Sequence, residues 1–321
     1  MEDFKIQNKY LNQPDMLANR VKKRFKHLKK QFAKENIDVF RLYDWDIPEI
    51  RAVVDWYGGH LVIGEYTRKQ SIPEWLPMMG EAVGKAMDVP PENVHLKERR
   101  YGIREGKRYA RVDYTDKKIV MNERDLKFLV NPYDYVDTGL FSDHRNTRLM
   151  IRNMAENKDF LNLYCYTGTF TCYAAKGGAR STVSVDRSET AISWVRDNFK
   201  LNGIPEEGNK LVQDHTLSFL KKAASKNMAF DLAVVDPPSF STTRVSNSDF
   251  DVVRDHPMLL RMVIQLMRDG STIFFSTNHQ DFEAYMGDLG VREFTEITDQ
   301  TIPVDYISKR KKIHRCWKIQ V

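Results

Sequence analysis

The chain has 321 residues, of which 41% are hydrophobic and 29% are charged, and it carries a formal net charge of +6. This length favours two domains, and the composition is ordinary for a globular protein. No apolar run approaches the roughly 20 residues that span a bilayer, and the first residues, MEDFKIQNKY, lack the apolar core of a secretory signal. We therefore expect a cytoplasmic protein without a membrane segment. Its positive charge suits a polyanion such as RNA, although many proteins without such a partner are equally basic.

The three cysteines of the chain, Cys165, Cys172 and Cys316, lie inside apolar segments. Cys165 and Cys172 are too far apart for a C-x-x-C pair, and no histidine cluster accompanies them in the sequence. This pattern indicates reduced thiols in a reducing compartment and no zinc site.

The first predicted element is an amphipathic helix over residues 14–36, in which apolar side chains recur every three or four positions. Asp15 follows Pro14, and we expect it to cap the start of the helix. Residues 20–34 carry eight Lys and Arg and no acidic residue. We expect Lys22, Lys23 and Lys26 to contact RNA phosphates. The alternative is a solvated helix face with no partner.

Residues 37–138 are predicted to form a small α+β subdomain that binds RNA. We expect strands over residues 37–44, 50–58, 60–68, 94–98 and 108–114, a helix over 73–87, and a hairpin within 119–130 whose turn lies near 122–124. Basic residues alternate with tyrosines between residues 97 and 111, which is typical of single-stranded RNA binding, and Arg99, Arg100 and Arg104 are the candidate contacts. A solvated loop is the alternative.

Residues 139–321 begin with a connector that leads into a helix near Asp143, the expected N-cap. Arg145 is placed to meet the carboxylate of an amino-acid cofactor as a charge-assisted pair. The alternative is a capping residue followed by exposed polar side chains.

A strand–turn–helix–strand unit over residues 160–187 is the centre of the predicted fold. An apolar strand over 160–164 is followed by a turn closed by Gly168, a helix over 169–176 and a second strand ending at Asp186. An acidic residue about 20 residues after the turn is typical of ribose recognition. The turn has a single glycine and bulky aromatic residues, so it suits S-adenosylmethionine better than a pyrophosphate. A doubly wound sheet without a nucleotide remains the alternative.

Alternating helices and strands continue to the end of the chain. Helices are predicted over residues 190–202, 216–224 and 250–267, and strands over 210–213, 231–235, 271–276, 293–298 and 314–321. Ligands of doubly wound sheets bind outside the carboxyl ends of the strands. Four polar residues fall at or near those ends: Asn162, Asp186, Asp214 and Asp236.

These strand-end residues suggest specific roles. We expect Asp186 to bind the ribose diol and Asp214 to accept from the adenine amino group. Asp236 begins the segment Asp236-Pro237-Pro238-Ser239-Phe240, where a carboxylate, a stiff turn with a free carbonyl and an aromatic face would hold an extruded nucleobase. The alternative for this segment is an Asx-type turn.

Several longer motifs resemble those of bacterial ribosomal RNA methyltransferases: YCYTGTFTCYAAKGGA, VSVDRSETAISWVRDNFKLNG, VDPPSFS and HRCWKI. More narrowly, QPDMLANRVKKRFKHL, FRLYDWDIPE and DYVDTGLFSDHR resemble the C-terminal, N7-guanine half of the bifunctional 23S rRNA guanine methyltransferases, in a stand-alone version. The resemblance covers the chain from about residue 8 to its end. It implies a class I fold: a Rossmann-like α/β sheet of seven mostly parallel strands, the last antiparallel, after a smaller α+β domain with a basic N-terminal helix.

The resemblance also implies the activity and its residues. S-adenosylmethionine is the implied cofactor, 23S rRNA in an unfolded or partly assembled form is the implied partner, and no metal or membrane is involved. The implied cofactor-binding residues are Phe141, Arg145, Asn162, Tyr164, Tyr166, Gly168, Asp186, Arg187 and Asp214. Asp236, Pro237, Pro238 and Phe240 would face the guanine, with Asp236 as an orienting acceptor rather than a base.

Two other functions compete with this interpretation. Related enzymes that methylate cytosine C5 need a catalytic cysteine after the fifth strand, and that region here reads FFSTNHQ, with Thr277 and Asn278 but no cysteine. The second competing function is that of an RNA-binding assembly protein whose methyltransferase fold is vestigial. The acidic strand ends argue against it, and measured cofactor binding would separate the two.

Overall fold

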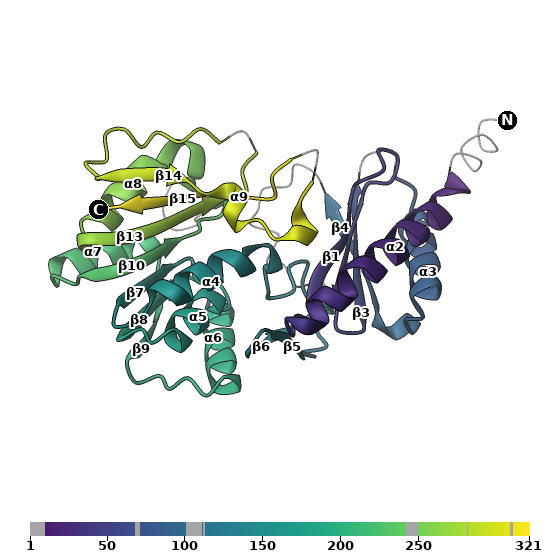
Figure 1. Ribbon diagram of the computed structural model, residues 1–321, viewed down its shortest axis with the longest axis horizontal. Helices are drawn as coiled ribbons and strands as arrows, with labels where there is room; N and C mark the ends of the chain where they lie inside the picture. Colours follow the sequence, from purple (N-terminus) through teal and green to yellow (C-terminus); the bar gives the residue numbers. More distant parts are fainter. Residues whose placement is uncertain are drawn as a thin grey trace. The chain divides into compact units, whose positions relative to one another are not determined.

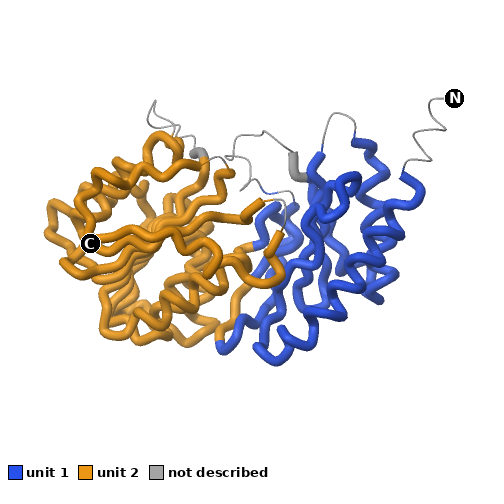
Figure 2. The backbone as a smooth tube through the Cα atoms, turned by 45° about the horizontal axis from the view of Figure 1, so that its top comes forward, with its two compact units in different colours: residues 1–103, 107–125, 130–138 blue, residues 104–106, 126–129, 139–321 orange. Residues whose placement is uncertain are grey.

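The computed structural model describes residues 10–67, 71–100, 111, 113–241, 250–280, 282–308 and 311–321, without the side chains of residues 99, 100, 240 and 241. The chain divides into two compact units (Figure 2). Unit 1 comprises residues 1–103, 107–125 and 130–138, and unit 2 comprises residues 104–106, 126–129 and 139–321. Among the described residues, no helix combines the length and the apolar character needed to cross a membrane.

Unit 1 is a four-stranded sheet with two helices packed on it. The sheet order is β1 (Val39–Asp44), β2 (Ala52–Tyr57), β3 (His60–Thr67) and β4 (Val94–Arg100). The first three strands are antiparallel, and β4 runs parallel to β3 because α3 (Trp75–Met87) and the short η1 (Pro91–Asn93) form the crossover. The apolar faces of α2 (Gln13–Lys34) and α3 share one core with β1, β2 and β3, and the amphipathic character that the periodicity predicts for α2 is confirmed.

Several local predictions in unit 1 need correction. Asn12, not Asp15, is the N-cap residue of α2, because a proline is tolerated in the first turn and the helix starts before it. The turn after β5 (Ile119–Glu123) lies at residues 124–125. Of the strand expected over 108–114, the described residues show only an isolated bridge between Arg111 and Tyr135. Arg104 and the side chains of Arg99 and Arg100 lie outside the described part.

Unit 2 contains the predicted seven-stranded sheet, with the order β14-β15-β13-β10-β7-β8-β9. Its strands are β7 (Asp159–Leu163), β8 (Ser181–Asp186), β9 (Asn209–Gln213), β10 (Phe230–Val235), β13 (Met267–Thr277), β14 (Glu293–Glu296) and β15 (Arg315–Gln320). The five strands from β13 to β9 are mutually parallel, and β15 is antiparallel to both of its neighbours. The Rossmann-like α/β architecture is therefore confirmed.

Helices cover both faces of this sheet (Figure 1). Alternate residues of the central strand β10 point to opposite faces. Leu232 and Val234 pack with α4 (Arg145–Met154) and α5 (Thr169–Lys176), whereas Ala233 and Val235 pack with α7 (Thr216–Ser225) and α8 (Val252–Ile264). Strands buried on both faces read as continuous apolar runs, which is why the sequence predicts them well. The remaining elements of the unit are β6 (Leu126–Val130), whose last residue belongs to unit 1, α6 (Glu189–Leu201), α9 (Thr298–Thr301), η3 (Ser142–His144) and η4 (Val304–Tyr306).

The predicted helix over residues 250–267 is shorter than expected. Phe250 and Asp251 form the two-residue strand β12, which pairs with β11 (Phe240–Ser241). The Asp251 carboxylate then accepts from the backbone N–H of Val253 and caps α8. At the other end, Met267 already belongs to β13. The helix is therefore bounded by the Asp251 cap and by the start of β13, and it is shorter than its apolar periodicity suggests.

Candidate active site at the carboxyl edge of the large sheet

The parallel strands β7, β8, β9, β10 and β13 all end at one edge of the sheet in unit 2. Asp186 is the last residue of β8, Asp214 follows β9, and Asp236 follows β10. The fold therefore brings together three acidic residues that are far apart in the sequence. Open α/β sheets bind their ligands outside this edge, so it is the candidate active site.

The loop after β7, residues 164–168, has an unusual backbone. Tyr164 and Tyr166 have positive φ angles of 58° and 49°, and Gly168 has a φ of 74°. A Cβ on Gly168 would lie 2.6 Å from Val195 Cγ1, so the position requires glycine for space as well as for conformation. Non-glycine residues with such backbone angles are strained and cluster at ligand sites. The loop is thus held close to helix α6, and the glycine that the sequence predicts to close the turn is required there.

Asp186 supports this loop directly. Its Oδ2 accepts from the backbone N–H of Tyr166 at 3.0 Å, and its Oδ1 accepts from the backbone N–H of Ser188 at 2.9 Å. Burial raises the pKa of Asp186, against the lowering effect of these backbone hydrogen bonds. A carboxylate has about four lone-pair sites, so both oxygens retain acceptor capacity for the hydroxyls of a ribose. The exposed Arg187 follows it in the chain.

Asp214 is held at the neighbouring strand end. Its Oδ2 lies 2.7 Å from Lys222 Nζ, and its Oδ1 accepts from the backbone N–H of His215 at 2.8 Å. Burial would raise the pKa of Asp214, but these two donors outweigh it and lower the pKa overall. The carboxylate is therefore ionised at neutral pH and suited to accept from an amino group.

Aromatic rings surround the loop. Phe141 is 41% exposed, and its ring centroid lies 5.4 Å from that of Tyr166, which in turn lies 6.3 Å from Trp194. Tyr164 packs against the core: its ring lies 6.2 Å from Phe250, and burial raises the pKa of its hydroxyl. Phe141 and Tyr166 are thus placed to line a ligand site, whereas Tyr164 belongs mainly to the core.

Two predicted cofactor residues are internal. Asn162 is buried, and its Nδ2 donates to Thr171 Oγ1 at 2.9 Å. Arg145 is also buried, where it pairs with Asp305 at 2.6 Å and donates from Nε to the Ser142 carbonyl. Asp305 thus provides a carboxylate for Arg145 within the protein, and the contact of Arg145 with a cofactor carboxylate stays a prediction.

The Asp-Pro-Pro segment presents a carboxylate at the end of β10. Asp236 Oδ1 accepts from Ser276 Oγ on β13 at 2.5 Å, and the side chain is 28% exposed. Ser239 Oγ donates to Asn278 Oδ1 at 2.5 Å. Ser276 thus fixes one oxygen of Asp236, and the other lies 3.8 Å from His144 Nε2. The side chain of Phe240 lies outside the described part.

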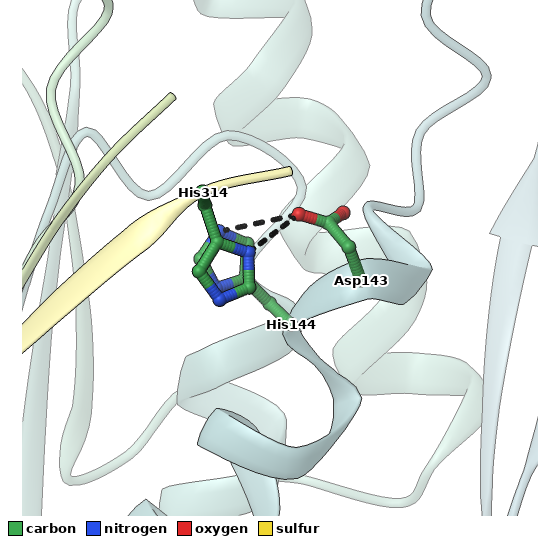
Figure 3. Close-up of side chains that lie close together, drawn as sticks. All are labelled: Asp143, His144 and His314. Carbon is green, nitrogen blue, oxygen red and sulfur yellow. Dashed lines mark hydrogen bonds and ion pairs between the residues drawn. The ribbon is translucent and has the colours of Figure 1, made fainter. Parts of the chain in front are cut away.

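A cluster of Asp143, His144 and His314 lies beside Asp236 (Figure 3). Asp143 is not the helix cap that the sequence suggests. Its Oδ2 accepts from His314 Nδ1 at 2.9 Å, and the N-cap residue of α4 is His144, the last residue of η3. Sequence reasoning missed this cluster, because His314 is 171 positions from Asp143 and no spacing pattern connects them.

The ligand atoms of these three side chains lie within 4.8 Å of one another, a spacing compatible with a cation. However, the 2.9 Å contact between Asp143 Oδ2 and His314 Nδ1 is the length of a direct hydrogen bond. The rings of His144 and His314 also stack face to face, with centroids 4.1 Å apart. We therefore interpret the cluster as a hydrogen-bonded arrangement.

The cysteines are not placed to act as nucleophiles at this edge of the sheet. All three are buried, and burial raises the pKa of the Cys172 thiol to about 12 and also raises the pKa values of Cys165 and Cys316. They are thus protonated at neutral pH. After β13 the chain continues with Asn278.

The basic face of α2 in unit 1 is a second functional candidate. Lys22, Lys23 and Lys26 are exposed, and within the described part of the chain none of them forms an ion pair. Arg20 on the same helix pairs with Asp46. The three lysines therefore keep their charge available for an anionic partner.

Comparison with known proteins gives a consistent result. Residues 110–295 match the family of S-adenosylmethionine-dependent methyltransferases. The ribosomal RNA large subunit methyltransferase K of Neisseria meningitidis serogroup B is 38% identical over 312 residues, which cover 94% of this chain and 86% of that protein. The methyltransferase K/L of Vibrio cholerae serotype O1 is 40% identical over 315 residues, but the chain spans only 43% of its length. A crystal structure described as a methyltransferase complexed with SAH has a TM-score of 0.74 at 21% identity, covering 95% of this chain and 82% of that one.

Proposed function

The chain belongs to the family of S-adenosylmethionine-dependent methyltransferases, and from this premise we propose that it methylates N7 of a guanine in 23S ribosomal RNA. S-adenosylmethionine is its cofactor. The ribosomal substrate is proposed because relatives at 38–40% identity carry the name ribosomal RNA large subunit methyltransferase.

The edge of the large sheet fits this cofactor. Asp186 has acceptor capacity for ribose hydroxyls, and Asp214 is an ionised acceptor one strand away. The rings of Phe141 and Tyr166 offer apolar surface beside the loop. When bound, S-adenosylmethionine supplies an electrophilic methyl group on a sulfonium. The residues of the chain need only position it and exclude water.

The choice of N7 rests on the hydrogen bonds that hold Asp236 and its neighbours. Guanine N7 has a free lone pair and no proton, so its methylation needs no base and depends on positioning. Asp236 is fixed by Ser276, and its open oxygen can accept from guanine N1–H or N2–H. With Ser239 donating to Asn278 Oδ1, the Asn278 Nδ2 is left to donate to guanine O6. The Asp236 acceptor and the Asn278 donor together complement the N–H and O6 groups of guanine.

Cytosine C5 methylation is the second candidate, and the structure disfavours it. That reaction requires a thiolate that adds to cytosine C6. The cysteines of this chain are buried and protonated, and Asn278 follows β13 where such a thiol would be needed. A non-catalytic RNA-binding protein is the third candidate, and it predicts no uptake of S-adenosylmethionine in calorimetry.

Mass spectrometry of nucleosides tests the proposed function. Purified protein is incubated with S-adenosylmethionine and with protein-free 23S rRNA, which is taken from cells that lack this methyltransferase. We expect 7-methylguanosine to increase by about one residue per rRNA molecule when all sites react. An increase in 5-methylcytidine would support the second candidate, and no methylated product on naked or partly assembled rRNA would overturn the proposal.

RNA capture is assigned to the basic face of α2. Replacing Lys22, Lys23 and Lys26 together by glutamate should weaken rRNA binding and flatten its dependence on salt. Each lost contact with a single-stranded phosphate reduces the slope of log affinity against log salt by about 0.7, so three contacts reduce it by about 2. Fluorescence anisotropy at several salt concentrations measures both quantities.

A matched variant controls for the change in net charge. Lys200, Lys210 and Lys221 are exposed in unit 2, and their triple replacement by glutamate changes the charge equally. If both triple variants bind rRNA with the same affinity and the same salt slope, α2 has no specific part in RNA binding, and its charged face is merely solvated.

A further inference from the structure

His144 is a buried titratable group that lies beside Asp236 and has no role in the reaction described above. Its Nε2 lies 3.8 Å from Asp236 Oδ2 and 3.7 Å from Asp143 Oδ2, and only 6% of its side chain is exposed. Burying a polar ring costs free energy unless it gains partners. A histidine between two carboxylates therefore calls for an explanation beyond packing.

The direction of the His144 ring is fixed by its neighbours. It stacks on His314 with the ring planes 10° apart, and it meets Phe170 edge-on at 5.5 Å. His314 is itself held by Asp143 and by Thr301 Oγ1, which lies 3.0 Å from its Nε2. Figure 3 shows the two rings one behind the other, with nitrogens turned toward the Asp143 carboxylate. The stack fixes the plane of the His144 ring, and in this plane Nε2 faces the Asp143 and Asp236 carboxylates.

The surroundings also select one tautomer. Burial, and next the neighbouring His314, lower the pKa of His144 to about 4, so the ring is neutral at pH 7 and carries one proton. Its Nδ1 is buried without a hydrogen-bond partner among the described residues. A lone pair on Nε2 would face two negative oxygens, whereas a proton there is attracted by both. The neutral ring is therefore an Nε2–H donor.

We propose that His144 is a positioning residue for Asp236, donating from Nε2 to Oδ2 when a nucleobase is bound. This inference rests on the proposed function. The separation of 3.8 Å is longer than a hydrogen bond, and contacts of this kind often tighten only when a reactant fills the site. Ser276 already holds Oδ1. A second donor on Oδ2 fixes the plane of the carboxylate.

Two substitutions separate positioning from packing. His144→Phe keeps a ring for stacking but removes the donor, and His144→Gln restores an N–H near the position of Nε2. We expect His144→Phe to keep the affinity for S-adenosylmethionine and the KM for rRNA within about twofold, while kcat falls roughly tenfold or more. His144→Gln should recover most of kcat. A kcat for His144→Phe equal to that of the wild type, or equal losses in both variants, would overturn the proposal.

A second histidine of unit 2 controls for the loss of a buried imidazole. His256 is also buried, but its ring nitrogens contact backbone groups of α8 and Tyr285. His256→Phe should therefore not lower kcat as His144→Phe does.

Nitrogen NMR tests the inference independently of the product. In protein with 15N-labelled imidazoles, the resonances assigned by their loss in His144→Gln should show a neutral Nε2–H tautomer from about pH 6 to 8. The Nδ1–H tautomer or an imidazolium in this range would overturn the inference, even if the wild type methylates guanine. The Nε2–H tautomer without methylation of rRNA would instead count against the proposed function.

Discussion

Replacing Asp236 by alanine is expected to reduce methyl transfer to rRNA about 100-fold or more, while the affinity for S-adenosylmethionine changes little. Asp236 stands at the end of β10 with one oxygen fixed by Ser276. In the proposed mechanism, loss of this carboxylate removes the acceptor that orients the base, and a misplacement of about 1 Å can cost about 100-fold in rate. Single-turnover transfer from radiolabelled S-adenosylmethionine measures the rate, and calorimetry measures the affinity.

Asp231 offers a matched control at the opposite end of the same strand. It pairs with Arg180 and Arg268, away from the carboxyl edge. Asp231→Asn should lower thermal stability without changing the rate of transfer. If Asp236→Ala abolishes cofactor binding instead of transfer, Asp236 belongs to the cofactor site and its role toward the base is wrong.

Replacing Asp186 by alanine should weaken the binding of S-adenosylmethionine about 10- to 100-fold, because it removes hydrogen bonds to a charged group. Burial raises the pKa of Asp186. As the pH is lowered, the wild type should therefore begin to lose affinity for S-adenosylmethionine at a higher pH than it would if Asp186 had the pKa of an ordinary aspartate. Calorimetry at several pH values measures both effects.

Asp186 also supports the backbone of Tyr166 and Ser188, so a damaged loop must be distinguished from a lost ligand contact. Asp186→Asn keeps one oxygen acceptor and the shape of the side chain, and it should retain the melting temperature better than Asp186→Ala. Affinity unchanged in both variants would mean that the ribose does not bind at the end of β8.

The elements around the loop were predictable because their signals are local. The helix expected over residues 169–176 coincides with α5, and the strand expected to end at Asp186 does so. Buried parallel strands give uninterrupted apolar runs, and Gly168 marks a turn that excludes a side chain. The positions of Asp186, Asp214 and Asp236 at one sheet edge then follow from the topology.

The errors arise where the partner of a side chain is remote in the sequence. When only their neighbours are considered, Asp143 suggests a helix cap and Arg145 suggests a partner for a cofactor carboxylate. In the structure they contact His314 and Asp305, which lie 171 and 160 residues away. No spacing rule predicts such contacts, because they depend on how α4 and the residues before β15 are placed in the folded unit. For the same reason His144 could not be recognised beside Asp236.

The central claim is that the cofactor lies across the carboxyl ends of β7, β8 and β9, with its methyl group directed at a base beside Asp236. A crystal structure of the protein with S-adenosylhomocysteine tests it most directly. We predict ribose hydroxyls on the Asp186 carboxylate, the adenine amino group beside Asp214, and the sulfur on the side of Asp236. Electron density for the ligand elsewhere, or an edge closed by protein side chains, would contradict the account.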